Sequence, residues 1–110
     1  MAKVTASPRE LEASLLLRAA ARLQTAHDSE EAKQAEMDSA LLFNRKLWSI
    51  FVTSVTRSDN PLPEPIRQNV ANIGLFVLKQ SVSIRNDEPE RLRSLISINR
   101  EIAAGLLGRA

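Results

Sequence analysis

A run of prolines near the middle of the chain limits the fold more than any other feature. Pro61, Pro63 and Pro65 stand within five positions of one another in a chain of 110 residues. Proline lacks the backbone N–H that a helix interior needs, and it disfavours helical backbone at the residue before it. The run therefore predicts a rigid, partly extended turn that ends one helical segment and precedes another.

The composition on both sides of this turn favours helix. Leu, Ala, Arg, Glu and Ser dominate, and the chain has only three glycines. With 44% hydrophobic and 25% charged residues, the balance is that of a globular protein. There is no cysteine, and no apolar stretch approaches the roughly 18 residues of a membrane span. The first ten residues lack the apolar core of a signal peptide, so we expect a cytoplasmic protein without membrane contact.

Two helices are predicted before the prolines. The first has Ser7 as N-cap, Pro8 at the first position and Glu10 completing a capping box, and it runs to about His27. Its apolar stripe is Leu11, Leu15, Ala19, Leu23 and Ala26. Asp28 and Glu31 have capping-box spacing, which predicts the start of the second helix. Its stripe is Met37, Leu41, Asn44, Trp48, Phe51 and Val55.

Two more helices are predicted after the prolines. The third begins near Pro63 or Pro65, and its stripe is Ile66, Val70, Ile73, Val77 and Ile84. Asp87 and Glu90 repeat the capping-box spacing, with Pro89 in the first turn of the fourth helix. Its stripe is Leu92, Leu95, Ile96, Asn99, Ile102, Ala103 and Leu106, and Gly108 is a natural terminator.

These elements predict an all-α fold, a small antiparallel helical bundle of about four helices, with two packed αα-hairpins as the alternative arrangement. We expect one domain over residues 1–110, with residues 1–6 as a flexible arm. Two similar segments, "SALLFNRKLWSIF" and "SLISINREIAAGL", lie 55 residues apart. Few aligned residues are identical, so a shared bundle geometry explains the offset better than an ancient duplication, although both remain open.

Asn44 and Asn99 lie on the main apolar stripes of their helices. A buried amide without a partner costs a few kcal/mol, so each should be hydrogen-bonded, to loop backbone near a helix end or to the other asparagine. We expect Trp48 and Phe51 to fill the core rather than to stack on nucleobases. The neighbouring Arg45 and Arg100 should lie at the stripe edge, within reach of carboxylates.

The middle helices carry more apolar residues than one buried stripe needs. At about 100° per residue, second stripes lie away from the main ones on the second and third helices. Such stripes are buried between the outer helices, form a contact between two copies of the chain, or line a groove for an amphipathic partner helix. The candidate partner-binding residues are Phe43, Leu47, Ile50, Leu75, Leu78 and Val82.

Nothing in the sequence predicts an enzyme or a cofactor. His27 is the only histidine and is expected at a helix end, where the dipole accommodates its charge. No phosphate-binding glycine loop, nucleophile motif or metal-ligand spacing occurs. The net charge of +2 comes from interleaved basic and acidic residues, which argues against direct nucleic-acid binding.

Three segments give the chain a family resemblance. "LLFNRKLWSIF", "NPLPEPIRQNVANIGLFVLKQ" and "LRSLISINREIAAGLLG" resemble the flagellar biosynthesis regulator FlaF family over about residues 11–108. The family pattern has an Asn-Arg-x-Leu-Trp element, an Asn-x-Leu-Pro turn and a closing Leu-Ile-x-Ile-Asn-Arg-x-Ile run. The matching residues include Asn44, Arg45, Leu47, Trp48, Asn60, Leu62, Pro63, Ile98, Asn99 and Arg100.

The resemblance implies a small, non-enzymatic helical protein needed for flagellin production and export. Its partner would be flagellin, bound through an amphipathic helix as a secretion chaperone. The alternative is a regulator of flagellin messenger RNA translation that acts with, or opposes, a second small regulator named FlbT. A homodimeric structural adaptor is a further alternative.

Overall fold

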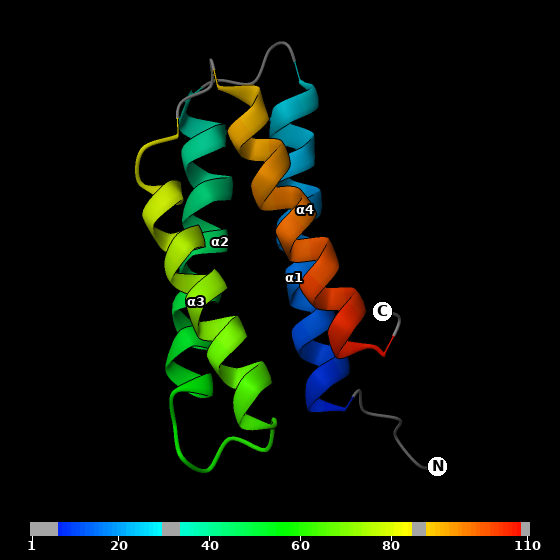
Figure 1. Ribbon diagram of the computed structural model, residues 1–110. Helices are drawn as coiled ribbons and strands as arrows, with labels where there is room; N and C mark the ends of the chain where they lie inside the picture. The colour runs from blue at the N-terminus through cyan, green and yellow to red at the C-terminus, as the bar shows by residue number, and fades with distance from the viewer. Residues whose placement is uncertain (1–6, 30–33, 85–87, 109–110) are drawn as a thin grey trace, which may run out of the picture.

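The computed structural model describes residues 7–29, 34–84 and 88–108, which fold into four α-helices (Figure 1). These are α1 (Pro8–Asp28), α2 (Gln34–Val55), α3 (Glu64–Ser81) and α4 (Pro89–Leu106). The expected all-α bundle is confirmed. The single-domain boundaries remain a prediction, since residues 1–6 and the last two lie outside the described residues.

The start of α1 follows its sequence closely. Ser7 Oγ accepts a hydrogen bond from the Glu10 backbone N–H at 3.1 Å, and Glu10 Oε1 accepts from the Ser7 N–H at 3.3 Å. This reciprocal pair is the predicted capping box. The two other predicted boxes include residues 31 and 87, which lie outside the described residues. Asp28, expected to cap α2, is instead the last residue of α1.

The proline run lies between α2 and α3, as predicted. Pro63 is the N-cap of α3 and Pro65 lies in its first turn, where no intrahelical N–H is required. The side chain of Asn60 holds the connection together by hydrogen bonds. Its Nδ2 donates to Ser54 O at 3.1 Å, and its Oδ1 accepts from the Leu62 N–H at 3.0 Å. Two residues of the family pattern, Asn60 and Leu62, therefore have a structural role in this turn.

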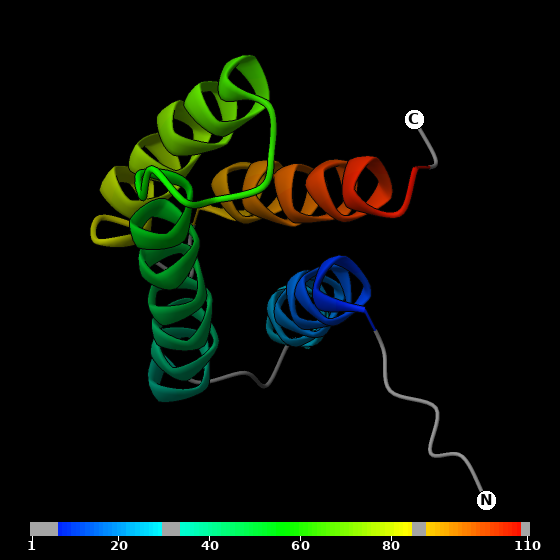
Figure 2. The same cartoon turned by 90° about the horizontal axis from the view of Figure 1, so that it is seen from below.

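The helices pack as two pairs that are joined by one further extensive contact. α1 packs against α4, α2 packs against α3, and α1 also packs against α2. α3 and α4 follow one another in sequence, yet the two helices diverge along their length (Figures 1 and 2). The bundle is therefore closed between α1 and α2 and open between α3 and α4.

All six residues of the predicted stripe of α2 are buried, together with Ala40 and Leu47. Trp48 is fully buried, and Phe51 meets it edge to face with ring centroids 5.7 Å apart. The other four stripe residues are buried as well: Met37, Leu41, Asn44 and Val55. The prediction that Trp48 and Phe51 fill the core is confirmed.

The predicted stripes of α1 and α3 are wrong at their first residues. Leu11 is 54% exposed and Ile66 is 48% exposed. α1 instead buries Ala13, Leu16 and Ala20 beside the predicted Ala19, Leu23 and Ala26. Its alanine-rich face allows α4 to approach closely, because interaxial distance depends on side-chain size. α3 likewise buries the small residues Gly74 and Ser81.

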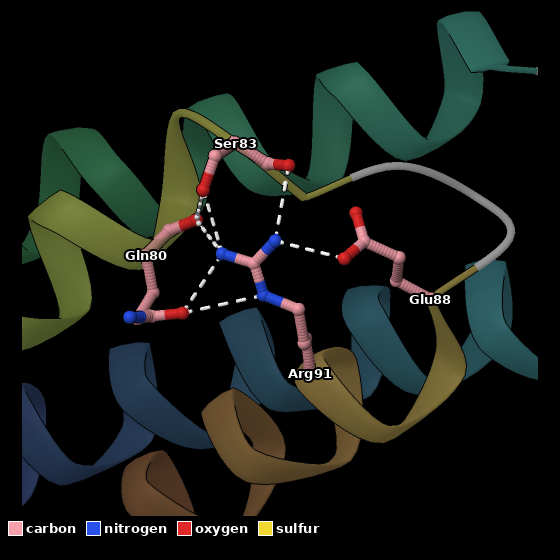
Figure 3. Close-up of polar contacts among 4 residues, drawn as sticks. All are labelled: Gln80, Ser83, Glu88 and Arg91. Atoms are coloured by element: carbon pink, nitrogen blue, oxygen red, sulfur yellow. Dashed lines mark hydrogen bonds and ion pairs between the residues drawn. The ribbon is translucent and has the colours of Figure 1, made fainter.

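The end of α3 is joined to the start of α4 by Arg91 (Figure 3). Arg91 Nη2 donates to Gln80 Oε1 at 2.8 Å and to Ser83 Oγ at 2.6 Å. Arg91 Nη1 donates to Ser83 O at 3.1 Å and to Glu88 Oε2 at 3.0 Å. Residues at a helix end leave carbonyls without intrahelical donors, and the guanidinium supplies donors there. This cluster fixes the end at which α3 and α4 meet.

Gly108 follows the C-cap residue of α4, Leu107, and has a φ of 72°, a conformation that glycine adopts without strain. The predicted terminator is therefore confirmed. Its N–H donates to Gly105 O at 3.1 Å, and the Leu107 N–H donates to Ala103 O at 3.0 Å.

Replacing Gly74 with alanine should destabilise the fold. The added Cβ would overlap Val52 Cγ2 and lie 3.2 Å from Trp48 Cε3. We expect Gly74→Ala to lower the free energy of unfolding by about 1–3 kcal/mol, measured by urea denaturation. Gly105→Ala is the control, because nothing lies within 4 Å of its added Cβ and alanine favours helix. A Gly74→Ala variant as stable as the control would contradict the close α2–α3 contact.

Candidate partner-binding surface

A buried amide on α4 connects three helices. Asn99 Nδ2 donates to Asn44 Oδ1 at 2.7 Å and to Leu16 O at 3.3 Å, while Asn99 Oδ1 accepts from Trp48 Nε1 at 2.9 Å. Asn44, Trp48 and Asn99 are fully buried. The prediction that the two asparagines face inward and bond to each other is confirmed. Their role in the described structure is to hold α4 in register with α1 and α2.

The two asparagines contribute unequally. Asn99 makes three hydrogen bonds, whereas Asn44 accepts one and its buried Nδ2 has no partner in the described part of the chain. The arginines that follow them lie outside this network. Arg100 Nη2 donates to the Gln24 side-chain oxygen at 3.5 Å, and the charge of Arg100 helps to lower the pKa of the Asp28 carboxyl, as expected of an arginine within reach of a carboxylate. Asn99 is therefore the centre of the polar core.

Replacing Asn99 with alanine should destabilise the protein more than replacing Asn44. Asn99→Ala leaves Trp48 Nε1 and Asn44 Oδ1 buried without partners, which predicts a loss of roughly 3 kcal/mol or more. Asn44→Ala removes one hydrogen bond and should cost less. Chemical denaturation monitored by Trp48 fluorescence measures both. A larger loss for Asn44→Ala would contradict the central position of Asn99.

The six candidate partner-binding residues do not share one surface. Leu47 is buried and Phe43 is half-buried, with the Arg22 guanidinium of α1 lying 4.8 Å from its ring centroid. Leu78 is also half-buried against the core. Three remain exposed, namely Ile50 (66%), Leu75 (57%) and Val82 (68%). The second stripe of α2 was expected to be buried between helices, to contact a second copy or to line a partner groove. Phe43 and Leu47 follow the first of these alternatives, since both are at least partly buried within the chain.

A hollow that the sequence did not predict lies between α3 and α4. It has a volume of about 260 Å³ and is lined by Asn72, Ile73, Phe76, Ile98, Glu101 and Ile102. The two similar segments 55 residues apart could have indicated it. Ile98 and Ile102 stand in the second segment where Phe43 and Leu47 stand in the first, so α4 also carries surplus apolar residues. These partly or fully buried residues of α2 thus have counterparts on α4 that border an open hollow.

The titratable groups with shifted pKa values lie apart from one another. Burial raises the pKa of Glu12 on α1, although Arg9 opposes the shift. A hydrogen bond with His27 lowers the pKa of Asp28 at the far end of α1. The Arg57 guanidinium lowers the pKa of Asp59 in the α2–α3 connection. These shifts have local causes, and they do not converge on the hollow between α3 and α4.

The described residues contain neither a cluster of metal ligands nor a membrane-spanning helix. Among them, no three His, Cys, Asp or Glu side chains are grouped as metal ligands would be. No helix in the described ranges has the length and apolar character that crossing a membrane requires.

Comparison with known proteins gives one match. A protein-family model described as "Flagellar protein FlaF" matches residues 1–106, a range that includes all four helices. No match was found among curated proteins or among solved structures.

Proposed function

The chain belongs to the flagellar protein FlaF family, and on this premise we propose that it binds flagellin in the cytoplasm as a secretion chaperone. Binding of this kind would support regulated flagellin synthesis, export and flagellum assembly. No catalytic step is part of this proposal, and its partner is an amphipathic helix of flagellin.

The observation that carries the proposal is the exposed apolar surface of α3. Ile66, Leu75 and Phe76 are each about half exposed, and Val82 at the end of the helix is exposed to 68%. A helix in a minimal bundle has one buried apolar stripe and a polar remainder. At about 100° per residue, Leu75 and Val82 share one side of α3, whereas Ile66 and Phe76 lie on other sides. Large apolar side chains exposed beyond the buried stripe are typical of an interaction site.

Covering an amphipathic helix of flagellin would require an exposed apolar surface of this kind. Flagellin assembles through amphipathic helices, which must be kept from associating before export. A chaperone can cover such a helix by receiving its apolar face between helices of its own. The surface of α3 is suited to that contact because its exposed side chains are large and apolar.

Direct binding to flagellin messenger RNA is the second candidate function, and the charge distribution disfavours it. Phosphate recognition needs clustered Lys and Arg, whereas this chain has fifteen basic and thirteen acidic residues. Arg91 is engaged by Gln80, Ser83 and Glu88. Any control of translation, including joint action with FlbT, would then follow indirectly from flagellin binding.

Purified protein mixed with monomeric flagellin tests the proposal. We expect a complex that co-elutes in size-exclusion chromatography and delays flagellin polymerisation, because the interacting helix is covered. The same protein should give no electrophoretic shift with flagellin leader RNA at physiological salt. Absence of the complex would contradict the chaperone proposal. An RNA shift that weakens steeply with salt would favour the regulator instead.

Light scattering across a concentration series addresses the homodimeric adaptor. The chaperone proposal predicts a monomer whose apolar surface is available to flagellin. A stable dimer that does not bind flagellin would support the adaptor instead.

A further inference from the structure

The two halves of the chain repeat one architecture with one difference. Shifted by 55 residues, α1 would span 63–83 and α2 would span 89–110, which cover the observed α3 (Glu64–Ser81) and α4 (Pro89–Leu106). The α1–α4 contact then corresponds to the α2–α3 contact, and both are present. The α1–α2 contact corresponds to an α3–α4 contact, and there the two helices diverge (Figure 2). One half of the repeat is closed and the other half is open.

The open half is an apolar groove bordered by both helices. Ile73 and Phe76 line it from α3, and Ile98 and Ile102 line it from α4. Phe76 is 49% exposed, and the three isoleucines are partly buried against the core. The Arg91 cluster holds the end of α3 against the start of α4 (Figure 3). The helices separate toward the start of α3 and the end of α4 (Figures 1 and 2).

Gly105 extends this face of α4 by one turn beyond Glu101 and Ile102. It occupies the position of Ile50 in the first half, and a Cβ at this residue would have nothing within 4 Å. A glycine inside a helix is less favourable than alanine by up to about 1 kcal/mol. No contact within the described residues requires glycine at position 105. Without a side chain there, the backbone of a partner helix can come close to α4.

We propose that the groove between α3 and α4 receives one amphipathic helix of the partner, packed on Phe76, Ile98 and Ile102 and passing close to Gly105. This inference rests on the proposed function, under which the helix belongs to flagellin. The helix presents apolar side chains at intervals of three and four residues to the groove, and its polar face points to solvent.

The size of the groove favours a single helix over a second copy of the chain. Six residues line its volume of about 260 Å³, whereas a stable interface between two protein chains has roughly 20–30 residues on each side. The space between two diverging helices suits a third helix, whose side chains can pack against both.

The charge at the rim indicates one polar feature of the partner helix. Glu101 is the charged residue among those that line the hollow, and among the described residues it has no ion-pair partner. Because its carboxylate is exposed, a Lys or Arg on the partner helix would pair with it there. We therefore expect a basic residue beside the apolar stripe of that helix.

Titration of fluorescently labelled monomeric flagellin, followed by anisotropy, tests the inference. Phe76→Ser removes an apolar side chain that lines the groove. Gly105→Leu places a large side chain in the open space that the partner helix would occupy. Each should weaken binding by about tenfold or more, with circular dichroism melting showing an intact fold. The matched control is Leu42→Ser on α2, since Leu42 is 41% exposed and lies outside the groove. Its binding should change by less than about twofold.

Each outcome decides a different point. Flagellin binding by the wild-type chain with unchanged affinity in Phe76→Ser and Gly105→Leu would overturn the groove assignment and leave the proposed function intact. Failure of the wild-type chain to bind would overturn both. A wild-type dimer that Gly105→Leu converts to monomer would identify a second copy as the occupant and overturn the inference.

Discussion

The hydrogen bonds of Asn99 are the interaction on which the arrangement of the helices depends. One amide on α4 reaches a backbone oxygen of α1 and two side chains of α2, all within the buried core. Because a buried amide is costly without partners, only the register that satisfies it is favourable. α3 is placed separately, by its close contact with α2 at Gly74 and by Arg91 at its end. These fixed points leave the opposite ends of α3 and α4 apart.

This arrangement gives a small flagellar protein both a stable core and an uncovered apolar surface. The asparagines of the family pattern belong to the core, and Asn60 and Leu62 belong to the turn between α2 and α3. The residues proposed for partner contact lie instead on α3 and on the adjacent face of α4. The family pattern thus describes the scaffold and, through Ile98 and Ile102 of its closing run, also the α4 side of the surface that we propose for flagellin.

Much of the fold could be predicted from the sequence, because its strongest features are local. The capping box at Ser7, the prolines around Pro63 and the regular stripe from Met37 to Val55 act through neighbouring residues. The exposure of Leu11 and Ile66 could not be predicted, because the buried face depends on which helix approaches. Phe43 and Leu47 were candidates for the same reason. Their spacing shows surplus apolar residues, but not that Leu47 is buried or that Arg22 of α1 lies over the Phe43 ring.

Under this proposal, the open half of the repeat binds the partner while the closed half serves as scaffold. Backbone amide chemical shifts of the labelled protein, recorded with and without monomeric flagellin, test it without any mutation. We predict the largest changes around Ile73 to Phe76 and around Ile98 to Gly105, with small changes in α1. Flagellin binding with its largest changes on α1, or on the face of α2 that carries Leu42, would contradict this account.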